Sequence, residues 1–140
     1  MASVTEAEAR SRLAAARVAT LGSISGDGAP HLVPVTFALD GPTVWTGLDA
    51  KPKRTGELRR HVNIRRRPEV SLLAQEWDED WSRLWWVRVD GSAVVTDEPE
   101  QVARAVALLR EKYRQYAEVE IGGPVIRLTI STWRGWRYAG

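Results

Sequence analysis

Cysteine is absent from the 140 residues of this chain. A chain without cysteine has no disulfide framework, no thiolate metal site and no thiol nucleophile. Histidine is also scarce, because only His31 and His61 occur, in different expected elements, with no carboxylate at a characteristic spacing. We therefore expect no metal site and no catalytic histidine, and a reducing, cytoplasmic location suits the sequence.

Long apolar runs are missing as well. No stretch of about 18 apolar residues occurs, and the first residues do not form the basic and apolar regions of a classical secretion signal. We therefore expect no membrane contact. The motifs Gly-x-Ser-x-Gly and Gly-x-Gly-x-x-Gly and the phosphate-binding P-loop are also absent. If the protein is an enzyme, a bound cofactor should supply the chemistry.

The composition that remains is typical of a globular protein, with 44% hydrophobic and 27% charged residues. The length suits one core, since a separate domain of ordinary size needs about 100 residues. We therefore expect residues 1–140 to form a single domain.

Positive charge is concentrated in one segment. The net charge of the chain is +2, yet residues 51–67 hold eight Lys or Arg residues against a single acid, Glu57. Such a local field favours an anion, either a phosphorylated small molecule or a nucleic acid. Nucleic acid is disfavoured, because the low net charge gives little general attraction and the aromatic residues lie mostly in apolar patterns.

Tryptophan is unusually frequent for a chain of this length, with seven residues. Indole rings present a large flat surface that stacks on a core, on a second subunit or on a ring ligand. The seven are Trp45, Trp77, Trp81, Trp85, Trp86, Trp133 and Trp136.

Local patterns predict alternating hairpins and helices. Thr5 and Glu8 form a capping box, and Asp97 with Glu100 forms a second capping arrangement. Pro34 should mark a strand edge or bulge, because proline cannot donate to a sheet ladder. We expect helices over residues 5–17, 54–66 and 97–116, and strands over residues 18–24, 31–39, 43–48, 70–77, 84–96 and 125–138. Hairpins without repeated strand-helix-strand units predict a mainly β (α+β) fold, an antiparallel barrel with peripheral helices.

The strand expected over residues 84–96 has two different faces. Period-two alternation places Trp85, Val87, Val89, Ala93 and Val95 on one face. The opposite face carries Trp86, Arg88, Asp90 and Ser92, a mixture that indicates a subunit interface or a ligand wall.

The segment 46–55 is the strongest candidate for a phosphate site. Lys51, Lys53 and Arg54 lie between the end of a strand and the start of a helix, where cations and free backbone amides together bind phosphate. A solvated basic turn is the alternative reading of the same residues.

Several segments in order resemble a known family. They are residues 16–21 (Ala-Arg-Val-Ala-Thr-Leu), 27–35 (Asp-Gly-Ala-Pro-His-Leu-Val-Pro-Val), 51–54 (Lys-Pro-Lys-Arg) with Leu58-Arg59, and 68–73 (Pro-Glu-Val-Ser-Leu-Leu). This pattern is similar to the pyridoxamine 5′-phosphate oxidase-like split barrels of the FMN- and F420-binding type. With residues 81–88 and 133–136, the chain more closely resembles their actinobacterial F420-dependent branch, over about residues 12–138.

The resemblance implies a cytoplasmic homodimer that binds coenzyme F420 at each of two equivalent interface sites. Carried over by position, Pro34, Val35 and Thr36 would face the cofactor ring. Thr46 and Gly47 would lie beside its phosphate or ribityl chain, and Lys51, Lys53 and Arg54 would bind the phosphate. The partner subunit would contribute Arg88, Arg134 and Trp136. For Trp77, Trp85 and Trp86 we favour core or dimer packing over substrate stacking.

The implied reaction is hydride transfer between the deazaflavin and a small unsaturated organic substrate, and no residue stands out as a proton donor. An FMN-binding flavoprotein of the same fold and a non-catalytic carrier of F420 or flavin are the alternatives.

Overall fold

The computed structural model describes residues 2–49 and 57–139. Its helices are α1 (Glu6–Ala15), α2 (Arg59–Arg66) and α3 (Pro99–Lys112), with short 3-10 turns at Trp81–Arg83 and Arg114–Ala117. Its strands are β1 (Ala2–Ser3), β2 (Ala19–Ile24), β3 (Pro30–Val35), β4 (Ala38–Asp40), β5 (Thr43–Asp49), β6 (Glu69–Glu76), β7 (Trp85–Thr96) and β8 (Ile121–Arg137). None of the helices in these residues is long and apolar enough to cross a membrane.

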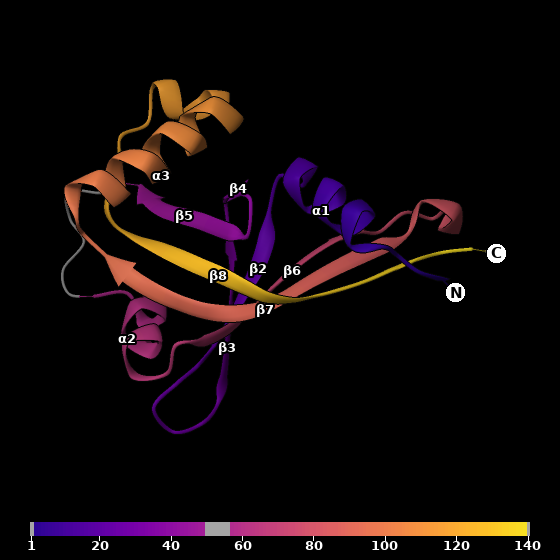
Figure 1. Cartoon of the computed structure of the whole chain (residues 1–140), viewed down its shortest axis with the longest axis horizontal. Helices are drawn as coiled ribbons and strands as arrows, with labels where there is room; N and C mark the ends of the chain where they lie inside the picture. Colours follow the sequence, from indigo (N-terminus) through magenta and orange to yellow (C-terminus); the bar gives the residue numbers. More distant parts are fainter. Residues whose placement is uncertain (1, 50–56, 140) are drawn as a thin grey trace.

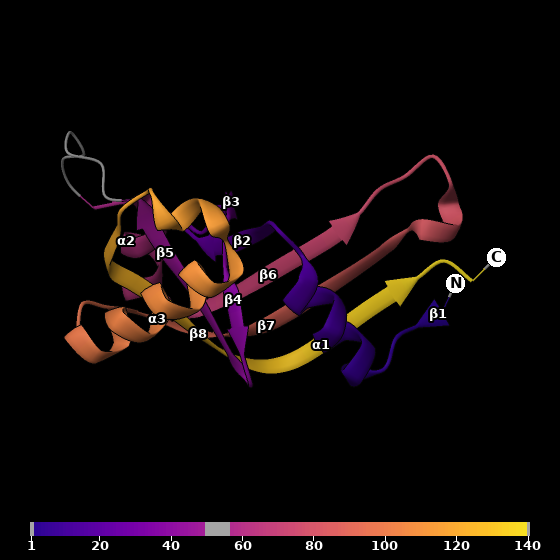
Figure 2. The ribbon, with the colours of Figure 1, turned by 90° about the horizontal axis from the view of Figure 1, so that it is seen from above.

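The strands form one antiparallel sheet in the order β3-β2-β6-β7-β8-β5-β4, with β1 added to β8. At one end the sheet curls around an apolar core that includes Phe37, and α2 and α3 lie at this end (Figure 1). At the other end β6, β7 and β8 run on as a ribbon toward both termini (Figure 2). The expected antiparallel split barrel with peripheral helices is confirmed.

The alternation expected for β7 is confirmed. Val87, Val89, Ala93 and Val95 are buried, and the half-buried Trp85 packs against the same core. The register with β8 shifts between Asp90 and Gly91, a β-bulge that increases the local bend of a strand. The bulge lets one continuous strand belong to both the curled end and the ribbon.

The capping predictions have different outcomes. Thr5 accepts a hydrogen bond from the Glu8 backbone N–H at 3.1 Å, so the cap of α1 is confirmed. The cap predicted at Asp97 is wrong, because the N-cap of α3 is Glu98 and its side chain makes no capping hydrogen bond. The hydroxyl of Thr96, the last residue of β7, instead accepts from the Glu98 N–H at 3.2 Å.

Other element bounds also differ from expectation. The strand expected over residues 31–39 is two strands, because the chain leaves β2 after Val35 and pairs with β5 from Ala38 onward. β8 begins at Ile121 instead of residue 125, since the end of β5 pairs with Ile121 and Gly122. α2 begins at Arg59, and the earlier part of its expected range, residues 54–56, lies outside the described residues.

A Gly91→Ala substitution tests the bulge. A Cβ at Gly91 would collide with the Thr129 carbonyl oxygen, which belongs to backbone and cannot swing away. We expect the substitution to lower the free energy of unfolding by about 2 to 3 kcal/mol. Chemical denaturation should show a lower midpoint with an unchanged slope.

Gly122→Ala is the matched control, because a Cβ at that strand position would meet nothing within 4 Å. Equal midpoints for the two variants would contradict the steric role of Gly91.

Candidate functional site

Four of the predicted cofactor residues come together where β3 ends beside β5. Val35 is buried at the end of β3, and Thr46 on β5 donates its hydroxyl to the Thr36 carbonyl oxygen at 2.7 Å. Gly47 occupies a register shift in β5, and a Cβ there would come within 3.1 Å of side-chain carbons of Leu109 and Ile121. We call this arrangement the corner. A larger residue at position 47 would require these side chains to shift by a few tenths of an ångström, whether or not a ligand binds.

A cleft of about 390 Å³ opens beside the corner. The Thr36 hydroxyl lies 2.7 Å from the Tyr116 hydroxyl. The Tyr113 hydroxyl accepts from the Phe37 N–H at 3.1 Å and donates to the Arg17 carbonyl oxygen at 2.9 Å. The residues that line the cleft are Arg17, Thr36, Tyr113, Gln115, Tyr116 and Val119. From the sequence, Tyr113 and Tyr116 were expected only within the helix over residues 97–116, so their role in shaping the cleft was missed.

Two cations lie at the corner without a carboxylate partner among the described residues. The Arg17 guanidinium stacks on the Tyr113 ring, with its carbon 4.6 Å from the ring centre. The Lys112 Nζ lies 3.8 Å from the centre of the Phe37 ring, and this buried atom has no hydrogen-bond partner. Burial, and to a lesser degree the positive charge of Arg17, lowers the pKa of Lys112 to about 8. The corner therefore has uncompensated positive charge.

The remaining described candidates lie on a different surface, the outer face of β3, β2, β6, β7 and β8. One row in register across these strands is Pro34, Thr20, Leu73, Arg88 and Arg134. Trp86 and Trp136 are paired in a neighbouring row. We call this surface the open face. As expected, Pro34 is on an edge strand, since β3 ends the sheet order.

The open face exposes apolar as well as charged groups. Leu32 on β3 is 70% exposed, and Pro34, Arg88 and Arg134 are exposed too. Trp136 is half-buried, and its indole nitrogen is buried without a hydrogen-bond partner. Exposed apolar surface on a sheet face of this kind is typical of an interaction site.

The partner-subunit candidates lie far from the corner of their own chain. Thr46 of the corner pairs with Ile126 on β8, and Arg134 and Trp136 lie eight and ten residues farther along that strand, which at about 3.3 Å per residue is roughly 26 to 33 Å. The structure therefore does not bring Arg88, Arg134 and Trp136 to the corner of their own chain. Lys51, Lys53 and Arg54 lie outside the described residues.

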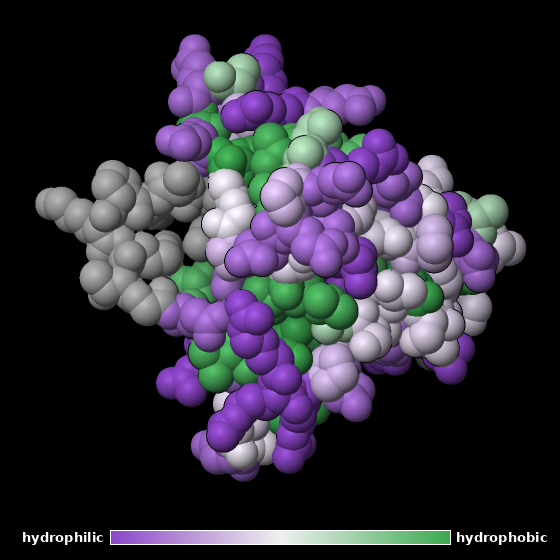
Figure 3. All heavy atoms as spheres, turned by 60° about the vertical axis from the view of Figure 1, so that its left-hand side comes forward, coloured by the Kyte–Doolittle hydropathy of each residue, from purple (hydrophilic) through white to green (hydrophobic). Residues whose placement is uncertain are grey.

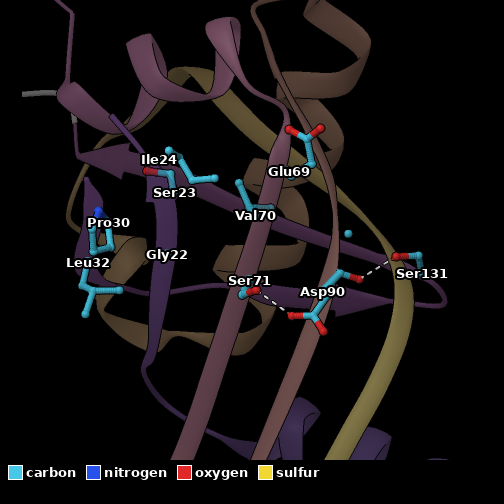
Figure 4. Close-up of a pocket in the computed structure, with 11 residues that line it drawn as sticks. Gly22, Ser23, Ile24, Pro30, Leu32, Glu69, Val70, Ser71, Asp90 and Ser131 are labelled. Carbon is cyan, nitrogen blue, oxygen red and sulfur yellow. Dashed lines mark hydrogen bonds between the residues drawn. The ribbon is translucent and has the colours of Figure 1, made fainter. Parts of the chain in front are cut away.

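A shallow pocket of about 460 Å³ lies on the open face, with Leu32 and Asp90 at opposite sides of it (Figure 4). Burial opposes ionisation of Asp90, but hydrogen bonds from Ser71 and Thr132 and the charge of Arg88 outweigh it and keep the pKa of Asp90 below its ordinary value. The Ser71 hydroxyl is 2.6 Å from the carboxylate, and Arg88 forms an ion pair with it at 3.1 Å. An ionised Asp90 and the neighbouring Glu69 make this pocket a poor place for an anionic cofactor.

The tryptophans for which core or dimer packing was expected have different environments. Trp85 packs against the core as expected. Trp77 is 66% exposed in the loop beyond β6, so core packing is wrong for it, and dimer packing, the other expected environment, stays a prediction.

The family to which the chain belongs is shown by its similarity to known proteins. Residues 5–137 match the pyridoxamine 5′-phosphate oxidase family over nearly the whole chain. The chain belongs to the pyridoxamine 5′-phosphate oxidase family. This is a family of flavin-binding oxidoreductases, and the fold described above is its split barrel. The comparison with curated proteins gives no match.

Solved structures share the fold of this family member. A conserved hypothetical protein of Mycobacterium tuberculosis has 27% sequence identity and a TM-score of 0.75, with 96% of this chain and 85% of that chain covered. An FAD-binding protein of Mesorhizobium loti has 21% identity and a TM-score of 0.69, with 96% and 93% covered. An FAD-binding protein of Mycobacterium smegmatis has 19% identity and a TM-score of 0.66, with 99% and 100% covered.

Lys112→Met tests the buried charge at the corner. The folded pKa of Lys112 is about 8, below the ordinary value of 10.5, so the ammonium destabilises the fold at pH 7. Between these two values the folded state has lost its proton while the unfolded state still holds it, so this penalty disappears as the pH rises.

We therefore expect Lys112→Met to unfold at higher urea concentration than the parent at pH 7, with a smaller difference at pH 9.5. A difference that stays constant across this range, or that grows, would show that the ammonium is not desolvated as described.

Proposed function

We propose that the protein is a homodimeric, F420-dependent oxidoreductase whose cofactor lies between the corner of one subunit and the open face of the other. Its main support is that the residues expected around the cofactor are separated within one chain, because Arg134 and Trp136 lie roughly 26 to 33 Å along β8 from the residue that pairs with Thr46 of the corner. A second copy of the chain provides a way for both groups to meet one ligand. The exposed Leu32 and Pro34 give the two copies an apolar contact.

The corner has the chemistry that an anionic deazaflavin needs. Arg17 and Lys112 supply positive charge that no described carboxylate neutralises, and the Thr36 and Tyr116 hydroxyls offer hydrogen bonds at the mouth of the cleft. β5 leads directly from Thr46 and Gly47 into the segment that contains Lys51, Lys53 and Arg54. We propose that these three cations bind the phosphate, with charge-assisted hydrogen bonds.

The bound deazaflavin would supply the hydride chemistry. The chain itself would bind the cofactor, orient it and shield it from water. Val35 and Thr36 would fix the height of the ring above the sheet, since both are held by the β3–β5 junction. Arg88, Arg134 and Trp136 of the partner subunit would close the cleft and exclude water. A small unsaturated organic compound beside Tyr116 would then be oriented for transfer.

FMN is the second candidate cofactor. It is favoured by the family, which binds flavins, and it would use the same phosphate site. The two cofactors are told apart by titration of the purified protein, because each chromophore reports its own binding by absorbance or fluorescence. A carrier protein would bind one of them without turnover of any enone, quinone or nitro compound.

Lys53→Ala and Arg54→Ala test the phosphate assignment. Loss of a charged phosphate contact costs about 1.5 to 3 kcal/mol, so we expect F420 affinity to fall about ten- to a hundredfold in each variant. Arg110→Ala, which removes an exposed arginine on α3, is the control and should bind as the parent does. Unchanged affinity in both test variants would reject the phosphate site.

Leu32→Asp tests the dimer. A charge on this exposed residue would have to be buried between two copies, so the variant should be monomeric by light scattering and should bind F420 at least tenfold more weakly. Its free energy of unfolding per chain should change little.

Ala107→Asp places the same charge on an exposed position of α3 and should remain dimeric. A dimer that survives Leu32→Asp would exclude the open face as the interface.

A further inference from the structure

Two tryptophans stand exposed on the loop between β6 and β7. Trp77 is 66% exposed and Trp81 is 56% exposed, and their ring centres are 6.4 Å apart. Trp81 also contacts Tyr138, with ring centres 6.5 Å apart. Exposed aromatic pairs are costly in water and are typical centres of binding interfaces.

Hydrogen bonds hold this loop in one conformation. Asp80 caps the 3-10 turn by accepting from the Ser82 N–H at 3.1 Å, and Asp78 accepts from the Asp80 N–H at 2.7 Å. Arg83 forms ion pairs with Glu76 at 3.2 Å and with Asp78 at 3.6 Å. The aromatic pair is therefore presented in a fixed geometry, which reduces the entropy cost of binding a partner.

The same loop is acidic, and the opposite end of the molecule is basic. Residues 76–84, which we call the acidic loop, contain four carboxylates and a single arginine. Residues 57–67, which include α2, contain five arginines and a single glutamate. Arg59, Arg66 and Arg67 are exposed, and within the described part of the chain none of them forms an ion pair.

The acidic loop and α2 of one chain do not meet. They lie at opposite ends of the long axis in both ribbon views (Figures 1 and 2). At the α2 end, hydrophobic atoms are exposed between hydrophilic atoms above and below them (Figure 3). Such a surface would suit aromatic rings flanked by carboxylates.

We propose that in the dimer the acidic loop of each subunit docks against α2 of the other, so that the two subunits run antiparallel. The proposal rests on the homodimer of the proposed function and specifies its orientation. Two copies joined face to face through the open face have a two-fold axis that lies in the plane of contact. An axis parallel to the long axis of the molecule would place acidic loop beside acidic loop and α2 beside α2, whereas an axis perpendicular to the long axis pairs opposite charges.

In this arrangement Trp77 and Trp81 of each subunit would line the basic side of the partner's cofactor site. A free surface for a different basic protein, or for a ring ligand, is the competing explanation of the exposed tryptophans.

Paired charge reversals test the orientation. Glu79→Arg alters an exposed residue of the acidic loop for which the structure shows no hydrogen bond, and Arg59→Glu alters the first residue of α2, where a carboxylate is compatible with the helix end. Each variant alone should weaken the dimer about three- to tenfold by sedimentation equilibrium at about 20 mM salt, where charges act over roughly 20 Å.

The Glu79→Arg/Arg59→Glu double variant should recover the parent dissociation constant to within about threefold. Glu79→Arg/Arg110→Glu is the matched control and should not recover, because Arg110 lies on α3. Recovery between groups at opposite ends of one chain requires contact between chains. Effects that simply add in the first double variant would overturn the proposal.

Trp77→Ala/Trp81→Ala separates the explanations. We expect the dimer to weaken by about tenfold or more. An unchanged dimer with weaker F420 binding would show that the tryptophans stack on the cofactor ring instead. An unchanged dimer with unchanged F420 binding would show that the tryptophans contact neither the second subunit nor the cofactor. Both results would overturn the docking and leave the proposed function standing. A parent chain that is monomeric with F420 bound would overturn both.

Discussion

The alternation of side chains along β7 is the constraint on which the rest of the structure depends. Val87, Val89, Ala93 and Val95 must face the core, so Trp86, Arg88 and Asp90 are forced onto the other side of the same strand. Because β7 is central in the sheet, its neighbours in register share this division. One face makes the barrel stable, and the other remains available for contact.

Much of this division could be predicted from the sequence, because period-two alternation and the Thr5 cap are local signals. The split between β3 and β4 could not, since the strand-like residues 31–39 give no sign that the chain changes partners at Thr36. The Asp97 cap was also wrong. The end of β7 at Thr96 was expected, but the Thr96 hydroxyl accepts the hydrogen bond from the Glu98 N–H and α3 starts one residue later than an Asp97 cap requires.

The candidate site could also be predicted from the sequence only in part. The structure brings Val35 and Thr36 close to Thr46 through the hydrogen bond from the Thr46 hydroxyl, but it places Pro34, which the resemblance grouped with them, on the open face. Their roles toward a cofactor stay predictions. Tyr113, Tyr116 and Lys112 were missed, since they approach the corner only when α3 packs against β5 and β8. The tyrosine hydroxyls had an available signal, because buried tyrosines usually seek a hydrogen-bond partner.

Opposite charges are concentrated at the two ends of the molecule's long axis. The acidic loop lies at one end of the long axis, and α2 lies toward the other. A long molecule with opposite charge at its ends gains most electrostatic attraction by pairing with a reversed copy. We propose that the same geometry would both join the two subunits and complete the cofactor site.

A crystal structure of the protein with F420 bound would show whether the cofactor site is shared between two chains. We expect a two-fold dimer in which the deazaflavin ring contacts Val35 and Thr36 of one chain and Arg134 or Trp136 of the other. A ring held entirely by one chain, or a dimer whose open faces point into solvent, would contradict it.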